Sequence, residues 1–480
     1  MSKNVAENKV LDFFKEISMI PRGSGNEKAI SDHMVTWAKT RNLEVHQDET
    51  LNIIIRKPAT PGYENAPGVI LQGHMDMVCE KNKGTEHDFM KDPIRLKFDG
   101  DMVYGTDTTL GADNGLGIAY AMAVLDDETL AHPSIEALMT VEEETSMAGA
   151  FGLDGSLLKN RILINLDSEE EGEFLVSSAG GTRCVLKYDY TPEIANEKEI
   201  YRITVGGLYG GHSGADINKG RGNAIKLLAR VLLGFAEAGG LQLLSINGGM
   251  KSNAIPREAE AVFAIEKGME SKLDAIVSEM DAAFKNEFFT NDGKVFVSIE
   301  KTGVEKKAMS IVATNKLIDL LLINPNGIQT MSGSIDGLVE SSTNIGVIKT
   351  ENSVVTMQNE VRSSVGSLKK EIRDRFVAFA RMTGCRFEIE SDYPQWEYKH
   401  DSLIRKIFID TYKEMNGTEP VITAIHAGLE CGVLSGKLEG LDCISMGPNQ
   451  YDVHTPKEHY SLSSSDRVYR FLVKVLANLK

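Results

Sequence analysis

The sequence predicts an α/β protein with a doubly wound, mostly parallel sheet, interrupted by an inserted α+β domain. In residues 1–182, apolar segments of strand length alternate with amphipathic helical segments, a pattern typical of a sheet covered by helices on both faces. From about Cys184 the pattern changes to alternating strands with helices between them, and after Trp396 the first pattern returns. We therefore expect the first domain in two parts, 1–182 and 392–480, around an insertion at 183–391.

The first part is expected to begin with two helices and then to build the sheet. Apolar residues share one face of a helix over about 5–19, and Asn26 is placed to cap a second helix that carries Trp37. Residues 80–112 form a polar loop with room for one hairpin, and loops of that length are usually functional. The other expected elements are strands at 51–55, 69–73, 134–140 and 161–166 and a helix at 116–125.

The inserted domain shows the order strand, helix, strand, strand twice, which hints at an internal duplication. Its expected strands are 185–190, 200–205, 241–246, 259–265, 295–300, 341–348 and 353–361, and its expected helices are 223–238, 270–286, 312–322 and 367–382. After Trp396, helices at 402–415 and 463–479 and strands at 421–425 and 441–446 would complete the first sheet.

The composition limits the classes of function. Of 480 residues, 42% are hydrophobic and 25% charged, which suits two or three domains with sizeable cores. The net charge is −17, and no run of Lys and Arg indicates a nucleic-acid binder. We find no apolar run of membrane-span length, no signal core and only five scattered cysteines. We therefore expect a cytoplasmic protein without disulfides that binds neither nucleic acid nor membrane.

Side chains that can bind metal follow the expected strands. His74 and Asp76 project together from the end of the strand at 69–73, because residues two apart in a strand face the same way. A lone pair of this kind would indicate only a surface His beside a surface Asp, but further residues make a series. They are Asp113 near a helix N-terminus, Glu142, Glu143 and Glu144 after the next strand, Asp167 after another, and His454. Open α/β sheets place their sites at such strand ends.

The chemistry of this series indicates divalent metal. Two histidines with several carboxylates and no cysteine suit zinc or a neighbouring ion. Two ions need one bridging carboxylate and two terminal ligands each, and His74, Asp113, Glu144, Asp167 and His454 are five such groups. One further Glu must act as general base toward an activated water, and the free neighbours are Glu142 and Glu143.

Four motifs then resemble the M20 family of co-catalytic metallopeptidases: Gly73-His74-Met75-Asp76, Gly111-Ala112-Asp113-Asn114-Gly115, Glu142-Glu143-Glu144 and the segment from Asn165 to Gly172. Within the family, the chain is similar to the aminoacyl-histidine dipeptidases of the PepD type, also called Xaa-His or cytosol non-specific dipeptidases. The segment from Ile425 to Gly432 and Gly447-Pro448 before His454 point to the same branch.

The resemblance implies a role for each residue of the series. Asp113 would bridge two ions, His74 and Asp167 would complete one site and Glu144 and His454 the other, Asp76 would hold the His74 imidazole, and Glu143 would be the base. An Asp at position 167 is what peptidase branches have, whereas deacylase branches tend to have Glu. Position 142 receives no role.

The resemblance also implies roles for the insertion as a lid and dimerisation domain. His212, within Gly210-Gly211-His212-Ser213-Gly214, would stabilise the oxyanion of the tetrahedral intermediate, often from the other subunit of a dimer. Asn253 and Arg362 would hold the substrate carboxylate, and Glu430 outside the insertion would meet the substrate amine. The simpler alternatives are a loop His between turn glycines, a surface salt bridge for Arg362 and a helix-terminal Glu at 430.

The function that follows is hydrolysis of unblocked dipeptides, including Xaa-His dipeptides such as carnosine, by a homodimer. The two ions per chain would be zinc, with cobalt or manganese as alternatives. Two other functions were weighed. A scaffold with a dead site would lack a ligand or the base, and none is missing. A deacylase of the same superfamily is disfavoured by Asp167 and by the segment from Ile425 to Gly432.

Overall fold

The computed structural model describes residues 8–195, 198–303 and 307–480, which divide into two units. The first unit comprises the described residues up to Ser177 with Trp396–Ala424 and Leu429–Lys480. The second comprises the described residues of Ser178–Gln395 with Ile425–Gly428. The boundaries differ from the expected 182/183 and 391/392 because β9 (Gly180–Asp189) and β21 (Arg386–Tyr393) run their full length in the second unit's sheet. Ile425–Gly428 also leaves the part at 392–480 that the sequence assigns to the first domain.

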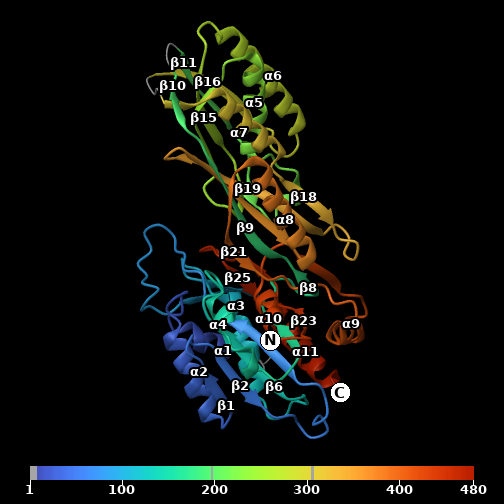
Figure 1. Cartoon of the computed structure of the whole chain (residues 1–480). Coiled ribbons are helices and arrows are strands. Elements are labelled where there is room, and N and C mark those ends of the chain that lie inside the picture. Colours follow the sequence, from blue (N-terminus) through green and yellow to red (C-terminus); the bar gives the residue numbers. More distant parts are fainter. Residues whose placement is uncertain (1–7, 196–197, 304–306) are drawn as a thin grey trace. The chain divides into compact units, whose positions relative to one another are not determined.

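The first unit is built on an eight-stranded mixed sheet. Its central strands, β6 (Ile135–Thr140), β3 (Val69–His74), β7 (Ile162–Asn165) and β23 (Asp442–Ser445), are parallel and lie side by side although β23 is far away in sequence (Figure 1). Antiparallel β2 (Ile53–Lys57) and β1 (Glu44–Gln47) extend one side, and β8 (Glu173–Ser178) and β22 (Val421–Ile425) the other. The predicted α/β class is confirmed, with parallel pairing among the four central strands.

Helices cover both faces of this sheet. The central strands are buried along their whole length, as strands between two helical layers must be. On one face, Ile70, Leu138 and Leu163 pack with Leu434 of α10. The first-unit helices are α1 (Lys9–Ser18), α2 (Lys28–Thr40), α3 (Ala112–Asp126), α4 (Ala148–Gly152), α9 (Leu403–Asn416), α10 (Glu430–Lys437) and α11 (Leu462–Asn478).

Several expected elements of the first unit differ in detail. Residues 5–7 of the first expected helix lie outside the described residues. Asn26 does not cap α2; Glu27 is the N-cap residue and makes no side-chain cap bond, because its carboxylate accepts the Gly25 N–H instead. The expected hairpin in the long loop is β4 (Leu96–Asp99) with β5 (Met102–Gly105), which joins β25 (His459–Ser461) and β24 (Gln450–Tyr451) in a small antiparallel sheet.

The second unit has a nine-stranded antiparallel sheet in two similar halves. The first half runs β11 (Glu199–Gly206), α5 (Ala224–Ala238), β13 (Gln242–Gly248), β15 (Ala259–Ile265), α6 (Glu270–Glu287) and β16 (Phe296–Thr302), in sheet order β16-β11-β15-β13. The second half runs β9, α7 (Ile311–Ile323), β19 (Val339–Glu351), β20 (Val354–Ser363), α8 (Gly366–Thr383) and β21, in sheet order β21-β9-β20-β19. Each half is therefore βαββαβ with the strand order 4-1-3-2, which agrees with the duplication suggested by the sequence.

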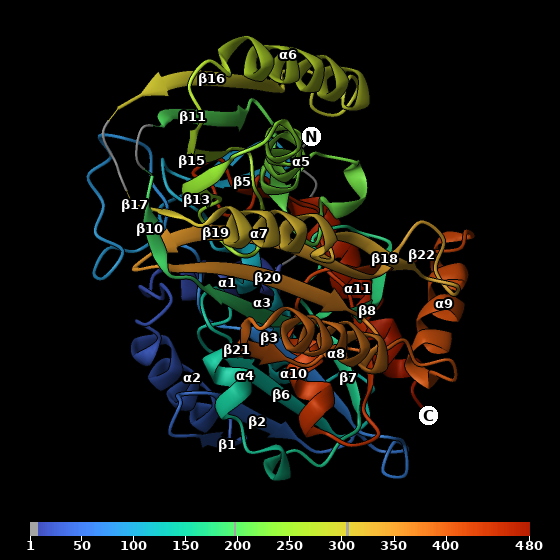
Figure 2. The same cartoon turned by 45° about the horizontal axis from the view of Figure 1, so that its top comes forward.

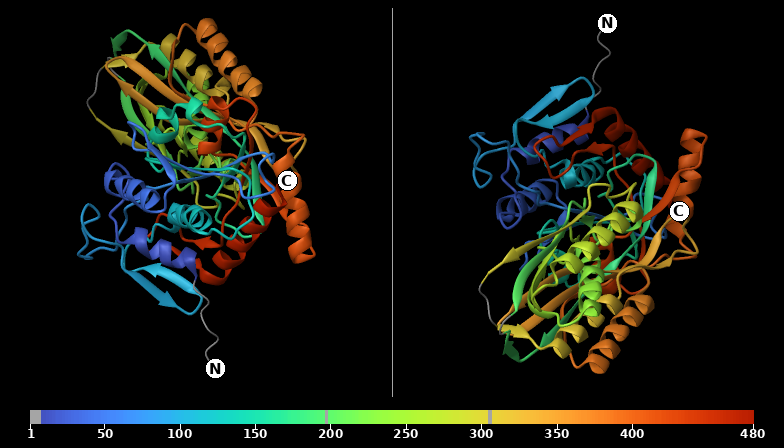
Figure 3. Two further views of the ribbon diagram at one scale, coloured as in Figure 1. Left: turned by 90° about the horizontal axis from the view of Figure 1, so that it is seen from below. Right: turned by 90° about the horizontal axis from the view of Figure 1, so that it is seen from above.

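The two halves meet edge to edge, where Gly248 of β13 pairs with Ile348 of β19. The helices α5, α6, α7 and α8 all lie on one face of the sheet (Figure 2, Figure 3). They enclose a single core in which Phe235, Phe263 and Phe376 are buried. Shorter strands β10 (Pro192–Ile194), β17 (Lys307–Met309), β12 (Gly211–His212), β14 (Ala254–Ile255) and β18 (Gly327–Met331) complete the unit.

Among the described residues, no helix has both the length and the apolar character required to cross a bilayer.

Candidate metal centre

Three neighbouring strands of the first unit deliver ligand-capable residues to one edge of its sheet. His74 is the last residue of β3, residues 142–144 follow β6, and Asp167 follows β7 by two residues. Because β6, β3 and β7 are parallel neighbours, their carboxyl ends meet at the same edge. Asp113 enters from the start of α3, and His454 from the loop after β24.

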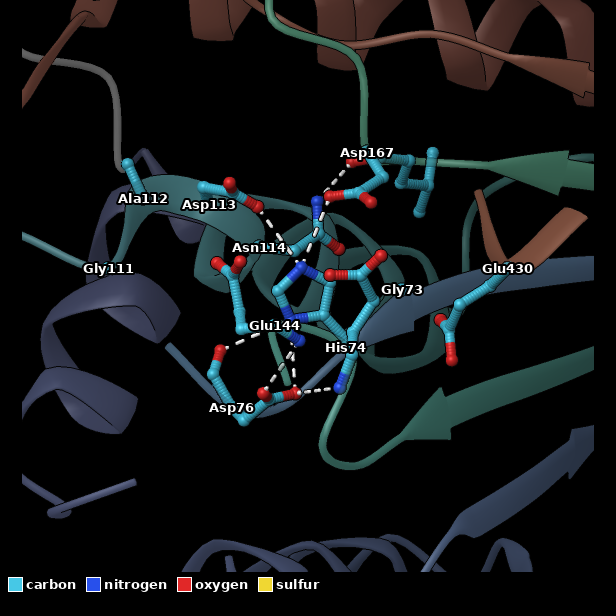
Figure 4. A network of polar contacts seen from close by, with 12 residues as sticks. Gly73, His74, Asp76, Gly111, Ala112, Asp113, Asn114, Glu144, Asp167 and Glu430 are labelled. Carbon is cyan, nitrogen blue, oxygen red and sulfur yellow. Dashed lines mark hydrogen bonds and ion pairs between the residues drawn. The ribbon is translucent and has the colours of Figure 1, made fainter. Parts of the chain in front are cut away.

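Asp113 lies between the two histidines. Its Oδ1 is 3.1 Å from His74 Nε2, and its Oδ2 is 3.1 Å from His454 Nε2. Asp167 Oδ1 lies 3.4 Å from His74 Nε2, and Glu144 Oε2 lies 3.0 Å from His454 Nε2. The carboxylates of Asp113 and Asp167 point toward the His74 imidazole from different sides (Figure 4).

Three groups of possible metal ligands result, each with its ligand atoms within 4.8 Å of one another. Two of them share Asp113: one is His74, Asp113 and Asp167, and the other is Asp113, Glu144 and His454. The third is His74, Glu143 and Glu144. The structure thus brings together all five residues that the sequence nominates as ligands, with Glu143 beside them.

Asp76 ties His74 to the chain after β6. Its Oδ1 lies 3.3 Å from His74 Nδ1 and accepts the Glu143 N–H at 3.0 Å. Its Oδ2 accepts the Glu144 N–H at 3.2 Å and the Ser24 hydroxyl at 2.7 Å. Burial alone would raise the pKa of Asp76, but the hydrogen bonds, with His74 foremost, hold it below its usual value. One carboxylate therefore orients an imidazole and fixes the backbone of two glutamates.

Two buried charged residues that the sequence reasoning missed hold the backbone around the centre. Arg22 donates from Nη1 to the carbonyls of Met75 and Asp76 at 3.0 and 3.1 Å, and from Nη2 to the Gly111 carbonyl. Glu458 accepts the N–H groups of residues 110–113 at 2.8, 3.0, 2.7 and 3.4 Å. Both residues bind backbone groups that are far away in sequence. In the sequence each is therefore only a charged residue near a motif, with nothing local to indicate its partner.

The backbone is left-handed at two positions of the centre, at Glu142 (φ 53°) and at His454 (φ 62°). For residues other than glycine this region costs of order 1 kcal/mol, and such residues concentrate at functional sites. The turn at Glu142 lets the chain leave β6 sharply, so that Glu143 and Glu144 both reach the Asp76 carboxylate.

Glu430 begins α10 and is only 2% exposed. Its Oε2 accepts Gln72 Nε2 at 2.6 Å and the Thr140 hydroxyl at 2.7 Å, whereas the buried Oε1 has no hydrogen-bond partner among the described residues. Burial raises the pKa of Glu430 to about 7. The predicted alternative of a plain helix-terminal glutamate is wrong, because such a residue would be solvated.

The second unit brings His212 and Arg362 together. His212 Nδ1 accepts the N–H groups of Gly214 and Ala215 at 3.3 and 3.1 Å, so in the neutral ring the proton is on Nε2. Burial, reinforced by Arg362, lowers the pKa of His212 to about 4. The ring is therefore neutral at pH 7, with its proton on Nε2, which lies 3.3 Å from Arg362 Nη2. Because both of these nitrogens carry hydrogens in this tautomer, the contact is a close approach and not a hydrogen bond.

Arg362 is 4% exposed, and its guanidinium donates to the Ser213 hydroxyl from Nε at 3.3 Å and to the Tyr393 hydroxyl from Nη1 at 2.8 Å. Within the part of the chain that the structure describes, no carboxylate lies within 4.0 Å of it, so the alternative of a surface salt bridge is wrong. Asn253 is exposed, next to β14, and its carbonyl accepts the Ser213 N–H at 2.9 Å.

The loop that carries His212 is fastened by Asp292, which is fully buried. Its carboxylate accepts the Tyr209 N–H at 2.5 Å and the Gly222 N–H at 2.6 Å, so it holds both ends of the loop. Asp216 accepts the His212 N–H at 2.8 Å from within the loop. Sequence reasoning missed Asp292, because it is about 80 residues away from the loop that it holds.

Comparison with known proteins places this geometry in a family. Residues 70–478 match peptidase family M20/M25/M40. The chain belongs to this family. It is 38% identical over 475 residues to a cytosol non-specific dipeptidase of Escherichia coli, an alignment that covers 98% of this chain and 97% of the relative. The predicted family is thereby confirmed, and with it the assignment of the chain as an enzyme of the peptidase class.

Solved structures show the same fold. The aminoacylhistidine dipeptidase of Vibrio alginolyticus superposes with a TM-score of 0.93 at 38% identity, over 100% of this chain and 98% of that one. The aminopeptidase PepT of Bacillus cereus superposes with a TM-score of 0.60 at 16% identity, over 99% of both chains, which reflects the shared fold alone.

The donor set of this M20 peptidase fits divalent metal. Zinc binds imidazole nitrogen and carboxylate oxygen at about 2.0–2.2 Å, so two ligand atoms on one tetrahedral ion are roughly 3.4 Å apart. The separations of 3.0–3.4 Å around the two Nε2 atoms suit that spacing. Asp167 Oδ1 is buried and accepts no hydrogen bond from the described residues, which leaves a lone pair for an ion.

The electrostatics of the centre point the same way. Burial would lower the pKa of His74, but Asp167 and Asp113 outweigh it and raise that pKa well above the usual value. Hydrogen bonds with Asp113 and Glu144 raise the pKa of His454 to about 11, and burial raises that of Asp167 to about 8. Without cations the cluster thus retains protons to offset its excess of carboxylates, a role that divalent ions would take over.

Proposed function

We propose that this M20 peptidase is a dinuclear-metal dipeptidase that hydrolyses the peptide bond of unblocked dipeptides. The observation that carries the proposal is the position of Asp113, whose two carboxylate oxygens each lie 3.1 Å from a different histidine. A carboxylate so placed can serve two ions at once. The 38% identity to proteins named dipeptidases over nearly the whole chain supports the same conclusion.

The proposed ligands are His74 and Asp167 for one ion and Glu144 and His454 for the other, with Asp113 shared. The imidazole and carboxylate donors favour zinc, with cobalt and manganese as alternatives. When bound, the ions would polarise the substrate carbonyl and make a water acidic enough to attack at neutral pH. Asp76 would keep His74 in the orientation and tautomer that ligation needs.

Glu143 is the proposed general base. It would take a proton from the attacking water and return it to the leaving amine nitrogen, the usual exchange of roles for a single carboxylate. Burial raises the pKa of Glu143 well above its usual value, as befits a carboxylate that must take up and release a proton. His212 would donate its Nε2–H to the oxyanion that develops on the substrate carbonyl.

The two ends of the substrate would be held by opposite charges. Glu430, with its unpaired buried oxygen, is the proposed receptor for the free amine, and Arg362 with Asn253 is the proposed receptor for the free carboxylate. A blocked or extended end would leave a buried charge unpaired, which costs roughly 1–3 kcal/mol or more. Xaa-His dipeptides such as carnosine are proposed substrates because of the name of the Vibrio relative alone.

The test compares kcat/KM for an unblocked dipeptide, its N-acetyl form and the tripeptide extended at the C-terminus, with N-acyl amino acids as the substrates of the deacylase alternative. We expect the dipeptide to exceed the others by about 5-fold to 150-fold for each unpaired charge. Comparable kcat/KM values for the dipeptide, its N-acetyl form and the tripeptide would refute the proposal that the enzyme binds both charged ends of the substrate. Faster turnover of N-acyl amino acids would favour the deacylase. Chelation should abolish turnover in either case.

The proposed homodimer in the cytosol, with the second unit as its lid and dimerisation domain, has a separate test. Light scattering or ultracentrifugation of the purified chain gives its oligomeric state. If His212 acts across subunits, mixing His212→Ala chains with Glu143→Ala chains should restore part of the activity. A mixed dimer without recovery would show that His212 acts on its own chain's substrate.

A further inference from the structure

His426 lies in a segment to which neither the metal chemistry nor the receptors described above assign a role. Residues Ile425–Gly428 pack with the second unit, although the chain on both sides of them belongs to the first. The Ala179 N–H donates to the Ile425 carbonyl at 3.1 Å and pins the segment there. Its position within the second unit therefore deserves a chemical explanation.

The segment lies beside two neighbours of Arg362, which are Ser342 on the adjacent strand and Tyr393. Ser342 of β19 is the cross-strand neighbour of Arg362 of β20, and its hydroxyl lies 2.7 Å from His426 Nε2. A side chain at Gly428 would meet the ring of Tyr393, the residue that accepts from Arg362 Nη1, at 2.9 Å. A Cβ at Gly214 would lie 2.0 Å from the His426 carbonyl oxygen and 3.1 Å from His212 Cε1. These contacts place the segment 426–428 next to Ser342 and Tyr393, the neighbours of Arg362, and next to the loop that carries His212.

His426 is 6% exposed, and its Nδ1 has no hydrogen-bond partner among the described residues. Burial, with Arg362 and then His212 adding to it, lowers the pKa of His426 to about 3, while the Val339 carbonyl acts in the opposite direction. The ring is neutral and carries one proton. If the Ser342 hydroxyl donates to Nε2, that proton is on Nδ1, the nitrogen for which the described residues offer no hydrogen-bond partner within 3.5 Å. The ring is close enough to the guanidinium for the charge of Arg362 to lower its pKa, and among the described residues no carboxylate pairs with Arg362.

We propose that His426 is a further substrate-binding residue, whose Nδ1–H binds the α-carboxylate of the peptide together with Arg362. The inference rests on the proposed function and adds to it a residue of the carboxylate receptor. A planar carboxylate accepts two hydrogen bonds from the guanidinium fork and has lone pairs left for a third donor. Such a donor would make recognition depend on the carboxylate's full charge and shape.

Two near-isosteric variants separate binding from a structural role. The amide of Asn occupies the place of Nδ1 in a histidine side chain, and the amide of Gln occupies the place of Nε2. His426→Asn therefore keeps a donor toward the carboxylate and loses the contact with Ser342, whereas His426→Gln keeps the Ser342 contact and loses the donor. In the full-length, metal-loaded protein we would measure kcat/KM for an unblocked dipeptide and for the same dipeptide as its C-terminal amide.

The readout is the ratio of kcat/KM for the dipeptide to kcat/KM for the amide. We expect His426→Gln to lower this ratio about 10-fold to 100-fold, the effect of one hydrogen bond to a charged group, while His426→Asn keeps it within about 3-fold of wild type. His132→Gln is the matched control, because His132 in the first unit is also buried and has a ring nitrogen without a partner. It should leave the ratio unchanged.

The inference would be overturned if His426→Gln kept the wild-type ratio while His426→Asn lowered kcat/KM equally for the dipeptide and the amide. His426 would then act by holding Ser342 in place and not by binding the carboxylate. Ser342→Ala is a milder variant in case the histidine variants do not fold. Ser342→Ala removes the hydroxyl that keeps the His426 proton on Nδ1, so it should lower the ratio about 3-fold. An unchanged ratio would contradict the proposal. A wild-type ratio near one, or no dipeptide turnover, would instead refute the proposed function itself.

Discussion

Replacing Asp76 with asparagine tests whether one buried carboxylate organises the metal centre. Asp76 faces His74 Nδ1 at 3.3 Å and accepts the N–H groups of Glu143 and Glu144 at 3.0 and 3.2 Å. Asn has nearly the same shape, but one of its two terminal groups is a donor. Whichever way the amide turns, it faces N–H donors on one side and loses the negative charge that holds the imidazole.

The magnitude follows from the contacts that the substitution removes. Losing the ion pair with His74 and one backbone bond to a charged group would sum to about 3–6 kcal/mol if such contributions were additive, at about 1.5–3 kcal/mol each. Within one network they are not additive, and substitutions behind metal ligands usually cost about 10-fold to 100-fold in metal affinity or activity. We therefore expect the Asp76→Asn protein to bind metal about 10-fold to 100-fold more weakly, or about 1.4–2.7 kcal/mol. At saturating metal kcat should still be lowered, because Glu143 loses its backbone anchor.

The assay is competition for zinc against an indicator chelator, followed by kcat at saturating metal. Asp101→Asn is the matched control, because Asp101 accepts the Ser463 N–H and hydroxyl at 2.9 Å each in the same unit. That variant should leave metal affinity unchanged even if it lowers the melting temperature. Unchanged affinity and unchanged kcat in Asp76→Asn would refute the assignment of Asp76 as the organising carboxylate.

Three further outcomes are expected. Glu143→Gln should lower kcat about 10²-fold to 10⁴-fold with metal content unchanged, whereas Glu144→Gln should lower metal content, and the reverse pattern would exchange the two roles. At pH 7 the pKa values of about 11 for His454 and about 8 for Asp167 leave both residues protonated in the metal-free protein, so loading both ions should release protons from both of them. The release should be about one proton per chain smaller at pH 9, above the pKa of about 8 at which Asp167 ionises; calorimetry in buffers of different ionisation enthalpy measures it, and release of less than about one proton at pH 7 would contradict the reasoning. Mixing His212→Ala chains with Arg362→Ala chains should restore no activity, because the two side chains meet within one unit of one chain, and recovery in demonstrably mixed oligomers would refute that.

The strand ends could be predicted from the sequence because the signals there are local. A buried strand is an apolar run, and its end is the first polar residue, so His74 after β3 and Asp167 after β7 are visible without any structure. Neighbouring parallel strands then bring those ends together by topology alone. Asp113 at the start of α3 and His454 in the loop after β24 do not end strands of this sheet, so this rule alone does not place them. The fold class and the meeting of His74, Glu144 and Asp167 follow from periodicity and this one rule.

The supports of the centre could not be predicted, because their partners are backbone atoms that any sequence possesses. Glu458 accepts N–H groups about 345 residues away, and Arg22 donates to carbonyls 53 to 89 residues away. Neither contact constrains the identity of its partner, so no residue pattern records it. The same holds for Asp292, which fastens the His212 loop through two backbone N–H groups.

The two similar halves of the second unit bear on why the chain would form a homodimer. A βαββαβ half with strand order 4-1-3-2 leaves an open edge at its second strand, and open edges tend to pair with another chain. Here β13 and β19, the second strands of the two halves, pair with each other. His212 comes from the first half and Arg362 from the second, yet they lie 3.3 Å apart. The two halves of one chain thus pair their open edges and bring His212 to Arg362, which two separate copies of a single half could do only by associating. The homodimer expected from the family stays a prediction, but bringing His212 to Arg362 can no longer be the reason for it.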